Sequence, residues 1–344
     1  MRVIRALLAL MALGLAATGV YYSHLKTYFE TEKILNQPFE FEFSRGMRLE
    51  SLCSVLESKI EISCLDFRLS IRMFSDFRRF QAGHYRIEGS FSPQSLAQTL
   101  SSGRTYRPVI FSITVPEGFT LAQIAQRLED GGIASKSDSL NLARQRGNLN
   151  RWRLPKGAYS AEGFLYPATY QFYEKPTAEE VLETMVAEFW KRLPKDFESN
   201  LKEQNLSLFQ AVSFASLIQA ETRFDEERSL ISKVIWTRLK TGMALGIDAA
   251  VIYGIPNYRG DIKSKDLKNK ENPYNLRIHR GLPPGPICNP DVASLLAVLT
   301  PSSEPVLYYV LRDDDSGKHS FSKNAKEHQR AVDRYLKYYR SKYR

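Results

Sequence analysis

The sequence predicts an α+β protein with an N-terminal transmembrane helix, and three observations lead to this class. An uncharged apolar run opens the chain, short strands with alternating apolar residues follow it, and amphipathic helix patterns fill the C-terminal half. The 344 residues are enough for two domains of ordinary size, and the 43% apolar content is enough to build buried cores.

The formal net charge of +10 favours anionic partners, such as nucleic acid, a phospholipid surface or a polymer that carries carboxylates. No pattern typical of a nucleic-acid-binding module accompanies this charge, so we expect no nucleic-acid partner. The five histidines show no metal-ligand spacing, and the sequence has no motif for a serine nucleophile or a phosphate loop. Carboxylates remain as the candidate catalytic groups, and we expect no metal and no cofactor.

Residues 1–25 predict a membrane anchor. Arg2 and Arg5 precede the uncharged run from Ala6 to Tyr22, which is about long enough to span a bilayer. The two arginines place the N-terminus in the cytoplasm and the rest of the chain outside it. A signal peptide cleaved near Ala16 is the alternative, and with either one the bulk of the chain is exported. Residues 26–37 are expected to form a linker.

Residues 38–150 form a predicted αβ region with an internal repeat. Alternating phenylalanines from Phe39 lead to Gly46 and a helix with one apolar face, and the pattern returns 72 residues later with Phe111 and Gly118. A strand, Gly-x-x-Leu and a helix resemble the opening half of a LysM module, a small fold that binds N-acetylglucosamine polymers. Any small αβ unit gives the same pattern, so the repeat alone does not separate glycan binding from packing.

Three cysteines fit an exported protein without identifying one. Cys53 and Cys64 are close enough in sequence to form a disulfide, which would leave Cys288 single. A pair of buried free thiols is the alternative.

We place the boundary of the C-terminal domain, residues 151–344, near Arg151, because residues 137–155 are polar and only partly periodic. Glu162 and Tyr166 open an aromatic-rich segment just beyond it. Aromatic faces stack against sugar rings and a glutamate beside them could bond hydroxyls, so the segment could be the wall of a cleft. Core packing explains the aromatic residues equally well.

The strongest site pattern lies in residues 206–254. Ser207 and Gln210 have the spacing of a capping box at the start of an apolar helix, and Glu221 falls in the last turn of that helix. A carboxylate there loses hydration and faces the negative end of the helix dipole, so its pKa rises, which suits a general acid. A surface glutamate at a helix end is the alternative. Asp225 is expected to cap the next helix, and Asp248 to lie in a loop.

The chain carries a series of ordered motifs from about Pro155 onward. They are Glu162-Gly-Phe-Leu-Tyr-Pro167, Leu217-Ile-Gln-Ala-Glu221-Thr, Val234 with Arg238-Leu, Gly242-Met-Ala-Leu, Asp248, Val251-Ile-Tyr-Gly, Pro273-Tyr-Asn275, Gly281-Leu-Pro-Pro-Gly-Pro-Ile287, Asn289-Pro290, Leu307-Tyr-Tyr-Val310, His319-Ser-Phe321 and Glu327-His328. Together they resemble the YceG-like family of endolytic murein transglycosylases. The resemblance implies a membrane-bound lyase with a LysM-like region and a mixed α+β catalytic domain in the periplasm.

The resemblance also implies a reaction and a set of site residues. The enzyme would cut the β-1,4 bond from N-acetylmuramic acid to N-acetylglucosamine in nascent peptidoglycan and leave 1,6-anhydro ends, close to the synthases (penicillin-binding proteins) in the inner membrane. Glu221 would act first as acid and then as base. Asp248 would stabilise charge at C1 or orient the N-acetyl group. Further candidates for the cleft lining by family position are Tyr253, Tyr274, Asn275 and His319.

The sequence departs from the family pattern around Asp248, where Gly246, Ile247, Ala249 and Ala250 replace the usual residues, and Leu276-Arg277 follows Asn275 in place of Thr-Tyr. Two alternatives therefore stay open. One is a muramidase that hydrolyses the same bond with help from Asp248, and the other is a non-catalytic scaffold that binds peptidoglycan.

Overall fold

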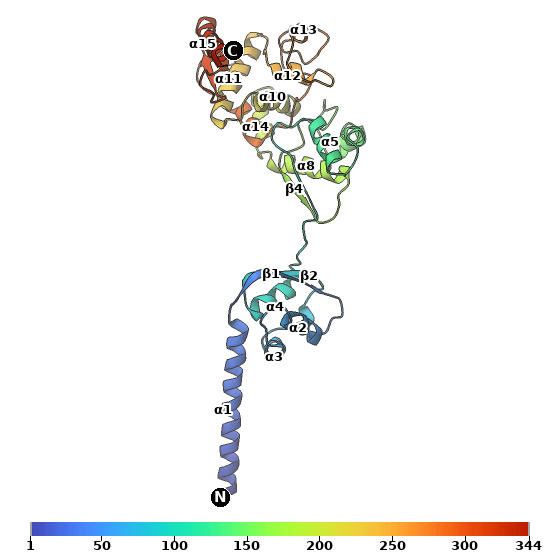
Figure 1. Ribbon diagram of the computed structural model, residues 1–344, viewed down its shortest axis with the longest axis vertical. Coiled ribbons are helices and arrows are strands. Elements are labelled where there is room, and N and C mark those ends of the chain that lie inside the picture. Colours follow the sequence, from blue (N-terminus) through green and yellow to red (C-terminus); the bar gives the residue numbers. More distant parts are fainter. Residues whose placement is uncertain (1, 343–344) are drawn as a thin grey trace. The chain divides into compact units, whose positions relative to one another are not determined.

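The computed structural model describes residues 2–342 (Figure 1). It combines helices with three two-stranded antiparallel sheets, so the predicted α+β class is confirmed. Backbone contacts divide the chain into two compact units, which we call unit 1, up to Val109, and unit 2, from Ile110 onward. Met1, Tyr343 and Arg344 belong to the predicted first and last domains but lie outside the described residues.

Helix α1 (Arg2–Glu30) opens unit 1 and is long and apolar enough to cross a membrane. Its side chains from Ile4 to His24 are exposed, whereas Leu25 and Phe29, four residues apart on one face, are buried in the core of unit 1. This apolar pair extends the helix past the predicted anchor boundary at residue 25. The structure therefore differs from the predicted linker at 26–37, because α1 continues to Glu30 and β1 begins at Lys33.

Unit 1 then follows a strand–helix–helix–strand order. Its elements are β1 (Lys33–Phe43), α2 (Leu49–Glu57), α3 (Cys64–Phe74), the 3-10 helix η1 (Phe77–Arg79), β2 (Gly83–Phe91) and α4 (Pro93–Ser102). β1 and β2 pair antiparallel with Phe41 opposite Tyr85, and apolar side chains from the strands and helices share one core. Cys53 and Cys64 form a disulfide that joins α2 to α3, while Cys288 is free and buried.

Unit 2 begins with a similar order, in which three helices lie between two paired strands. Its elements are β3 (Phe111–Thr114), α5 (Leu121–Asp130), α6 (Lys136–Leu142), α7 (Arg146–Arg151) and β4 (Thr169–Phe172), with β3 and β4 antiparallel. Gly46 and Gly118 have φ angles of +84° and +74°, a conformation that favours glycine, and Leu49 and Leu121 each begin the helix that follows.

The boundary between the units falls just before β3, ahead of the predicted boundary near Arg151. The reason is that β4, which pairs with β3, and α8 (Ala178–Arg192), which shares a core with α5, both come later in the chain. β3 and α5 cannot bury their apolar faces without these later elements. The segment from β3 to β4 is therefore part of unit 2.

The rest of unit 2 surrounds one buried helix, α10 (Leu208–Glu221), which packs against α9 (Phe197–Glu203), α11 (Asp225–Thr241), α12 (Asp248–Tyr253) and α14 (Val292–Leu299) (Figure 1). The remaining elements are α13 (Ser264–Leu267), the hairpin of β5 (Tyr308–Leu311) and β6 (His319–Ser322), and α15 (Ala325–Lys342), which packs on that hairpin. Contrary to the prediction, Asp225 is the first residue of α11 and Phe224 is its N-cap; the Asp225 carboxylate accepts a hydrogen bond from Arg228 at 3.0 Å.

Candidate active site

Helix α10 delivers Glu221 to the site. The predicted capping box is present: the Ser207 backbone N–H donates to the Gln210 side chain at 2.9 Å, and the Gln210 N–H donates to the Ser207 hydroxyl at 3.2 Å. Every residue from Ala211 to Gln219 is buried, so packing fixes the helix on all sides. Glu221 is its last residue, and the extended backbone of Thr222 ends the helix there.

Glu221 lines two hollows in unit 2. The first, which we call the ring hollow, has a volume of about 490 Å³ and is lined by Glu221, Arg238, Gly246, Asp248, Arg277, Tyr308, Tyr309, Val310, Leu311, His319, His328 and Val332. The second, which we call the charged hollow, has a volume of about 620 Å³ and is lined by Pro116, Glu117, Gln219, Ala220, Glu221, Thr222, Arg223 and Gly317. A ligand longer than one residue or one sugar could therefore contact Glu221 from both sides.

The surroundings of Glu221 favour its neutral form at higher pH than usual. Burial raises the pKa of Glu221, and the negative charge of Asp248 acts in the same direction. A hydrogen bond from Tyr309 and the positive charges of His319 and Arg238 oppose this and lower the pKa. The net direction is upward, so Glu221 can carry a proton to a substrate and still find partners that stabilise the carboxylate once the proton has left.

His319 is held beside Glu221 by a buried glutamate, Glu227. The His319 ring Nδ1 lies 2.8 Å from the Glu227 carboxylate, and the His319 backbone N–H donates to the same group at 2.6 Å. Thr222, directly after Glu221, donates its hydroxyl to Glu227 at 2.9 Å. Glu227 therefore links the end of α10 to the start of β6 and fixes the orientation of the imidazole.

Asp248 forms an ion pair across the floor of the ring hollow. Both of its carboxylate oxygens accept hydrogen bonds from Arg277, at 2.6 and 2.9 Å. Contrary to the prediction of a loop position, Asp248 is the first residue of α12. This bidentate pair occupies one lone pair on each carboxylate oxygen.

Glu162, by contrast, lies in a separate buried cluster. Its carboxylate accepts hydrogen bonds from the backbone N–H of Leu121 at 2.9 and 3.0 Å, from the Tyr253 hydroxyl at 3.0 Å and from Asn289 at 3.1 Å. Burial raises the pKa of Glu162 to about 7, although all of these donors lower it. Glu162 thus joins the start of α5 to the end of α12 and is placed to hold the fold together.

The other predicted cleft residues also lie outside the described linings of both hollows. The Tyr253 ring packs edge-on against Tyr274, whose hydroxyl shares a hydrogen bond with Tyr159. Asn275 is fully buried and donates to loop carbonyls, including that of Asn269 at 2.9 Å. The Tyr166 ring packs under the Arg192 guanidinium. These residues pack the loops beside the site. The ring hollow brings together three of the eight predicted site residues, which are Glu221, Asp248 and His319.

Sequence reasoning missed four residues that the structure adds to this site: Tyr309, Arg238, Glu227 and Arg277. Tyr309 and Arg238 belong to quoted motifs, but nothing in β5 or α11 alone indicates that they meet at Glu221. Arg238 is half-buried and donates to the carbonyls of Leu307 and Leu245, at 3.1 and 2.6 Å, and burial lowers its pKa. The one signal in the sequence was the charge of Glu227, which lies among the buried residues of α11. The sequence does not identify the residue that binds it.

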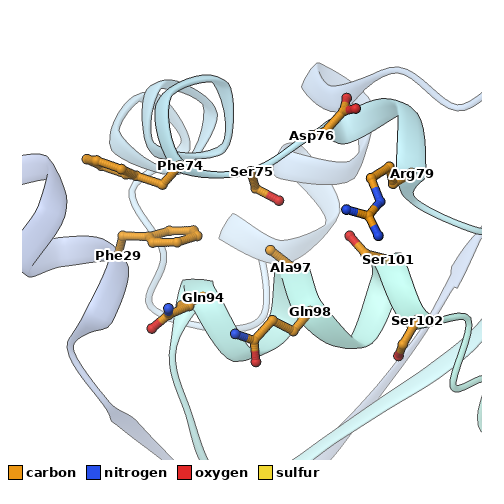
Figure 2. Close-up of a pocket in the computed structure, with 10 residues that line it drawn as sticks. All are labelled: Phe29, Phe74, Ser75, Asp76, Arg79, Gln94, Ala97, Gln98, Ser101 and Ser102. Atoms are coloured by element: carbon orange, nitrogen blue, oxygen red, sulfur yellow. The ribbon is translucent and has the colours of Figure 1, made fainter.

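Unit 1 has a hollow of its own, with a volume of about 370 Å³ (Figure 2). Phe29 and Phe74 face each other at one end with ring centroids 5.5 Å apart, and the amide side chains of Gln94 and Gln98 come from α4 below them. The other lining residues are Ser75, Asp76, Arg79, Ala97, Ser101 and Ser102. The hollow therefore combines aromatic faces with hydrogen-bonding groups.

Comparisons with known proteins show what the chain is similar to. A model of the YceG-like family matches residues 41–334. The chain is similar to a Bacillus subtilis (strain 168) protein named endolytic murein transglycosylase, at 30% identity over 270 residues that cover 75% of this chain and 73% of that protein. A Streptococcus pneumoniae (serotype 2, strain D39) protein with the same name is 29% identical over 284 residues, and the match spans 51% of its length. A crystal structure of a putative yceG-like protein from Listeria monocytogenes aligns with a TM-score of 0.59 at 27% identity, covering 86% of this chain and 99% of that one.

Proposed function

The chain belongs to the YceG-like family, and on this premise we propose that it is an endolytic murein transglycosylase whose unit 2 carries catalysis. The observation that carries the proposal is the position of Glu221. It is a half-buried carboxylate with a raised pKa, open to two hollows, in a site where Tyr309, His319 and Arg238 can stabilise it after it loses its proton. A general acid that must next act as a base needs both properties.

We propose the following course for the reaction. Glu221 protonates the oxygen that leaves N-acetylmuramic acid C1, and the C1–O bond breaks as positive charge develops at C1. Asp248, held by Arg277, faces that charge from the ring hollow. The Glu221 carboxylate then takes the proton from the C6 hydroxyl of the same sugar as that oxygen bonds to C1. The products are a 1,6-anhydro end and a free N-acetylglucosamine end, and no water is consumed.

The Asp248–Arg277 pair favours this course over hydrolysis. A muramidase would use a second carboxylate to bind and deprotonate water. In this site each oxygen of Asp248 already accepts a hydrogen bond from Arg277, at 2.6 and 2.9 Å, and these bonds compete with the binding of a water molecule. The pair suits an electrostatic role better than the role of a base.

We further propose that α1 anchors the chain in the inner membrane, with its N-terminus in the cytoplasm and both units in the periplasm. The length and apolar exposed surface of α1 and the position of Arg5 before that surface support this orientation. The anchor would keep the site close to newly made strands and to the synthases that polymerise them.

Unit 1 is proposed to be a LysM-like module that contacts glycan. The order β1, α2, α3, β2 and the hollow with Phe29, Phe74, Gln94 and Gln98 support this, since aromatic faces and amides are typical sugar contacts (Figure 2). Replacing Gln94 and Gln98 together by alanine should reduce cosedimentation of the full chain with sacculi. Undiminished cosedimentation would move glycan contact away from this hollow.

Mass spectrometry of fragments released from purified peptidoglycan by the full chain in detergent tests the proposal. We expect muropeptides lighter by one water than their hydrolysed equivalents, and none from the Glu221→Gln variant. Fragments with ordinary reducing ends would favour the muramidase. Binding without release, in both proteins, would favour the scaffold.

A further inference from the structure

The two hollows that share Glu221 differ in chemistry. The ring hollow contains four rings, those of Tyr308, Tyr309, His319 and His328. The charged hollow has no aromatic ring among its described lining residues. Both hollows contain opposite charges, but in the ring hollow Asp248 pairs with Arg277, whereas in the charged hollow Glu117 and Arg223 are exposed and form no ion pair with each other. Sugar rings pack against aromatic faces, so the ring hollow suits saccharide, whereas exposed opposite charges that are not paired with each other suit a ligand that is itself charged.

The Arg223 side chain is exposed and can bind an anion. Its guanidinium stacks 5.1 Å from the centre of the Phe224 ring, and it lies beside the β5–β6 turn at Gly317. The Lys318 ammonium lies over the same ring at 5.2 Å and pairs with Glu226 at 2.8 Å. In the described part of the chain no carboxylate pairs with Arg223, so stacking orients the guanidinium and leaves its donors available.

Glu117 is held in place by the loop that carries it. The loop joins β3 to α5, and the Gly118 N–H donates to the Asn289 carbonyl at 3.1 Å, while Asn289 donates back to the Phe119 carbonyl at 2.9 Å. The Glu117 side chain is 55% exposed, and the guanidinium of the buried Arg228 lies 3.8 Å from its carboxylate. Arg228 is already bound by Asp291 at 2.7 Å, so Glu117 retains capacity for a second cation.

Peptidoglycan strands carry opposite charges on their peptides rather than on their sugars. Each stem peptide hangs from the lactyl group of N-acetylmuramic acid, and it has a free carboxylate on its glutamate and a free amine on its diamino acid until cross-linking. We propose that the charged hollow is a stem-peptide subsite, in which Arg223 binds a peptide carboxylate and Glu117 binds the free ammonium. The enzyme then selects strands that carry uncross-linked peptides. This inference rests on the proposed function of Glu221.

The test compares two substrates for the full chain in detergent: uncross-linked glycan strands with their peptides, and the same strands stripped by an amidase. The readout is the ratio of kcat/KM for release of 1,6-anhydro ends. We expect the unmodified protein to favour peptide-bearing strands about tenfold, because a charge-assisted hydrogen bond contributes on that scale. Arg223→Met should bring the ratio close to one, and Arg223→Lys should restore part of it.

Arg146→Met is the matched control, since Arg146 is an exposed arginine of unit 2 outside both linings. It should leave the ratio unchanged. A ratio near one for the unmodified protein, or equal losses on both substrates with Arg223→Met, would overturn the peptide subsite while the transglycosylase stands. Absence of cleaved ends from either substrate would overturn the proposed function and the subsite with it.

Discussion

Glu221 and Glu162 are two glutamates of unit 2 whose surroundings have opposite consequences. Burial raises the pKa of both. Glu162 accepts hydrogen bonds from a backbone N–H, a tyrosine and an asparagine, and it has no place in the described lining of either hollow. Glu221 has one such donor, Tyr309, and lines two hollows. A raised pKa therefore does not identify a catalytic acid; room for a substrate beside an incompletely bonded carboxylate does.

The largest expected effect separates the two glutamates directly. Glu221→Gln keeps the shape of the side chain and removes the proton that it transfers, so kcat should fall by at least about 1000-fold with the melting temperature unchanged. Glu162→Gln should retain most of its activity. The release of 1,6-anhydro ends, measured beside thermal unfolding, checks both. Equal losses of activity would mean that Glu162 takes part in the reaction.

The second effect concerns stability and belongs to Glu162. Its folded pKa of about 7 lies above its ordinary value of 4.5, so the folded state binds more protons between these values. The stabilisation is complete below about pH 4.5 and is lost as the pH rises through 7, amounting to about 3 kcal/mol. Glu162→Gln should flatten this decline. Unfolding by denaturant from pH 5 to 8 measures it, and an unaltered slope would assign the decline to other groups.

A smaller effect is expected from the Asp248–Arg277 pair. Asp248→Asn removes a charge that faces C1 in the ring hollow, and kcat should fall about tenfold, less than for a fully buried group because the pair is partly exposed to solvent. Asp196→Asn, at an exposed aspartate outside both linings, serves as the control. A loss as large as that of Glu221→Gln would indicate that Asp248 transfers protons, as in a muramidase.

The smallest effect tests the single hydrogen bond to Glu221. Tyr309 donates to the charged form and lowers the pKa, so Tyr309→Phe should raise the pKa of Glu221 further. The alkaline limb of the pH–rate profile reports ionisation of the acid, and it should move to higher pH. A shift to lower pH would mean that Tyr309 does not stabilise the carboxylate in the working enzyme.

Local signals in the sequence predicted some parts of this site well. The capping box of α10, its end at Glu221 and the repeated glycine before α2 and α5 depend on residues within a few positions of one another. The prediction that Tyr166, Tyr253 and Tyr274 line the cleft was less successful, because residues close to a site residue in sequence need not point into the same hollow. Asp248 and Tyr253 are the two ends of α12, so five residues turn their side chains about 140° apart and only Asp248 reaches the ring hollow. Tyr309 and Arg238 reach Glu221, and Glu227 reaches His319 beside it, only through tertiary packing.

Helix α1 runs without a break from its exposed apolar surface to Leu25 and Phe29 in the core of unit 1. With α1 spanning the membrane as proposed, a continuous helix rather than a flexible linker would connect the membrane to the core of unit 1. A transmembrane helix whose apolar stretch is longer than the hydrocarbon thickness of the bilayer tilts. Unit 1 would then lean by the same angle, so that the thickness of the lipid around the anchor would set the direction in which the folded unit faces.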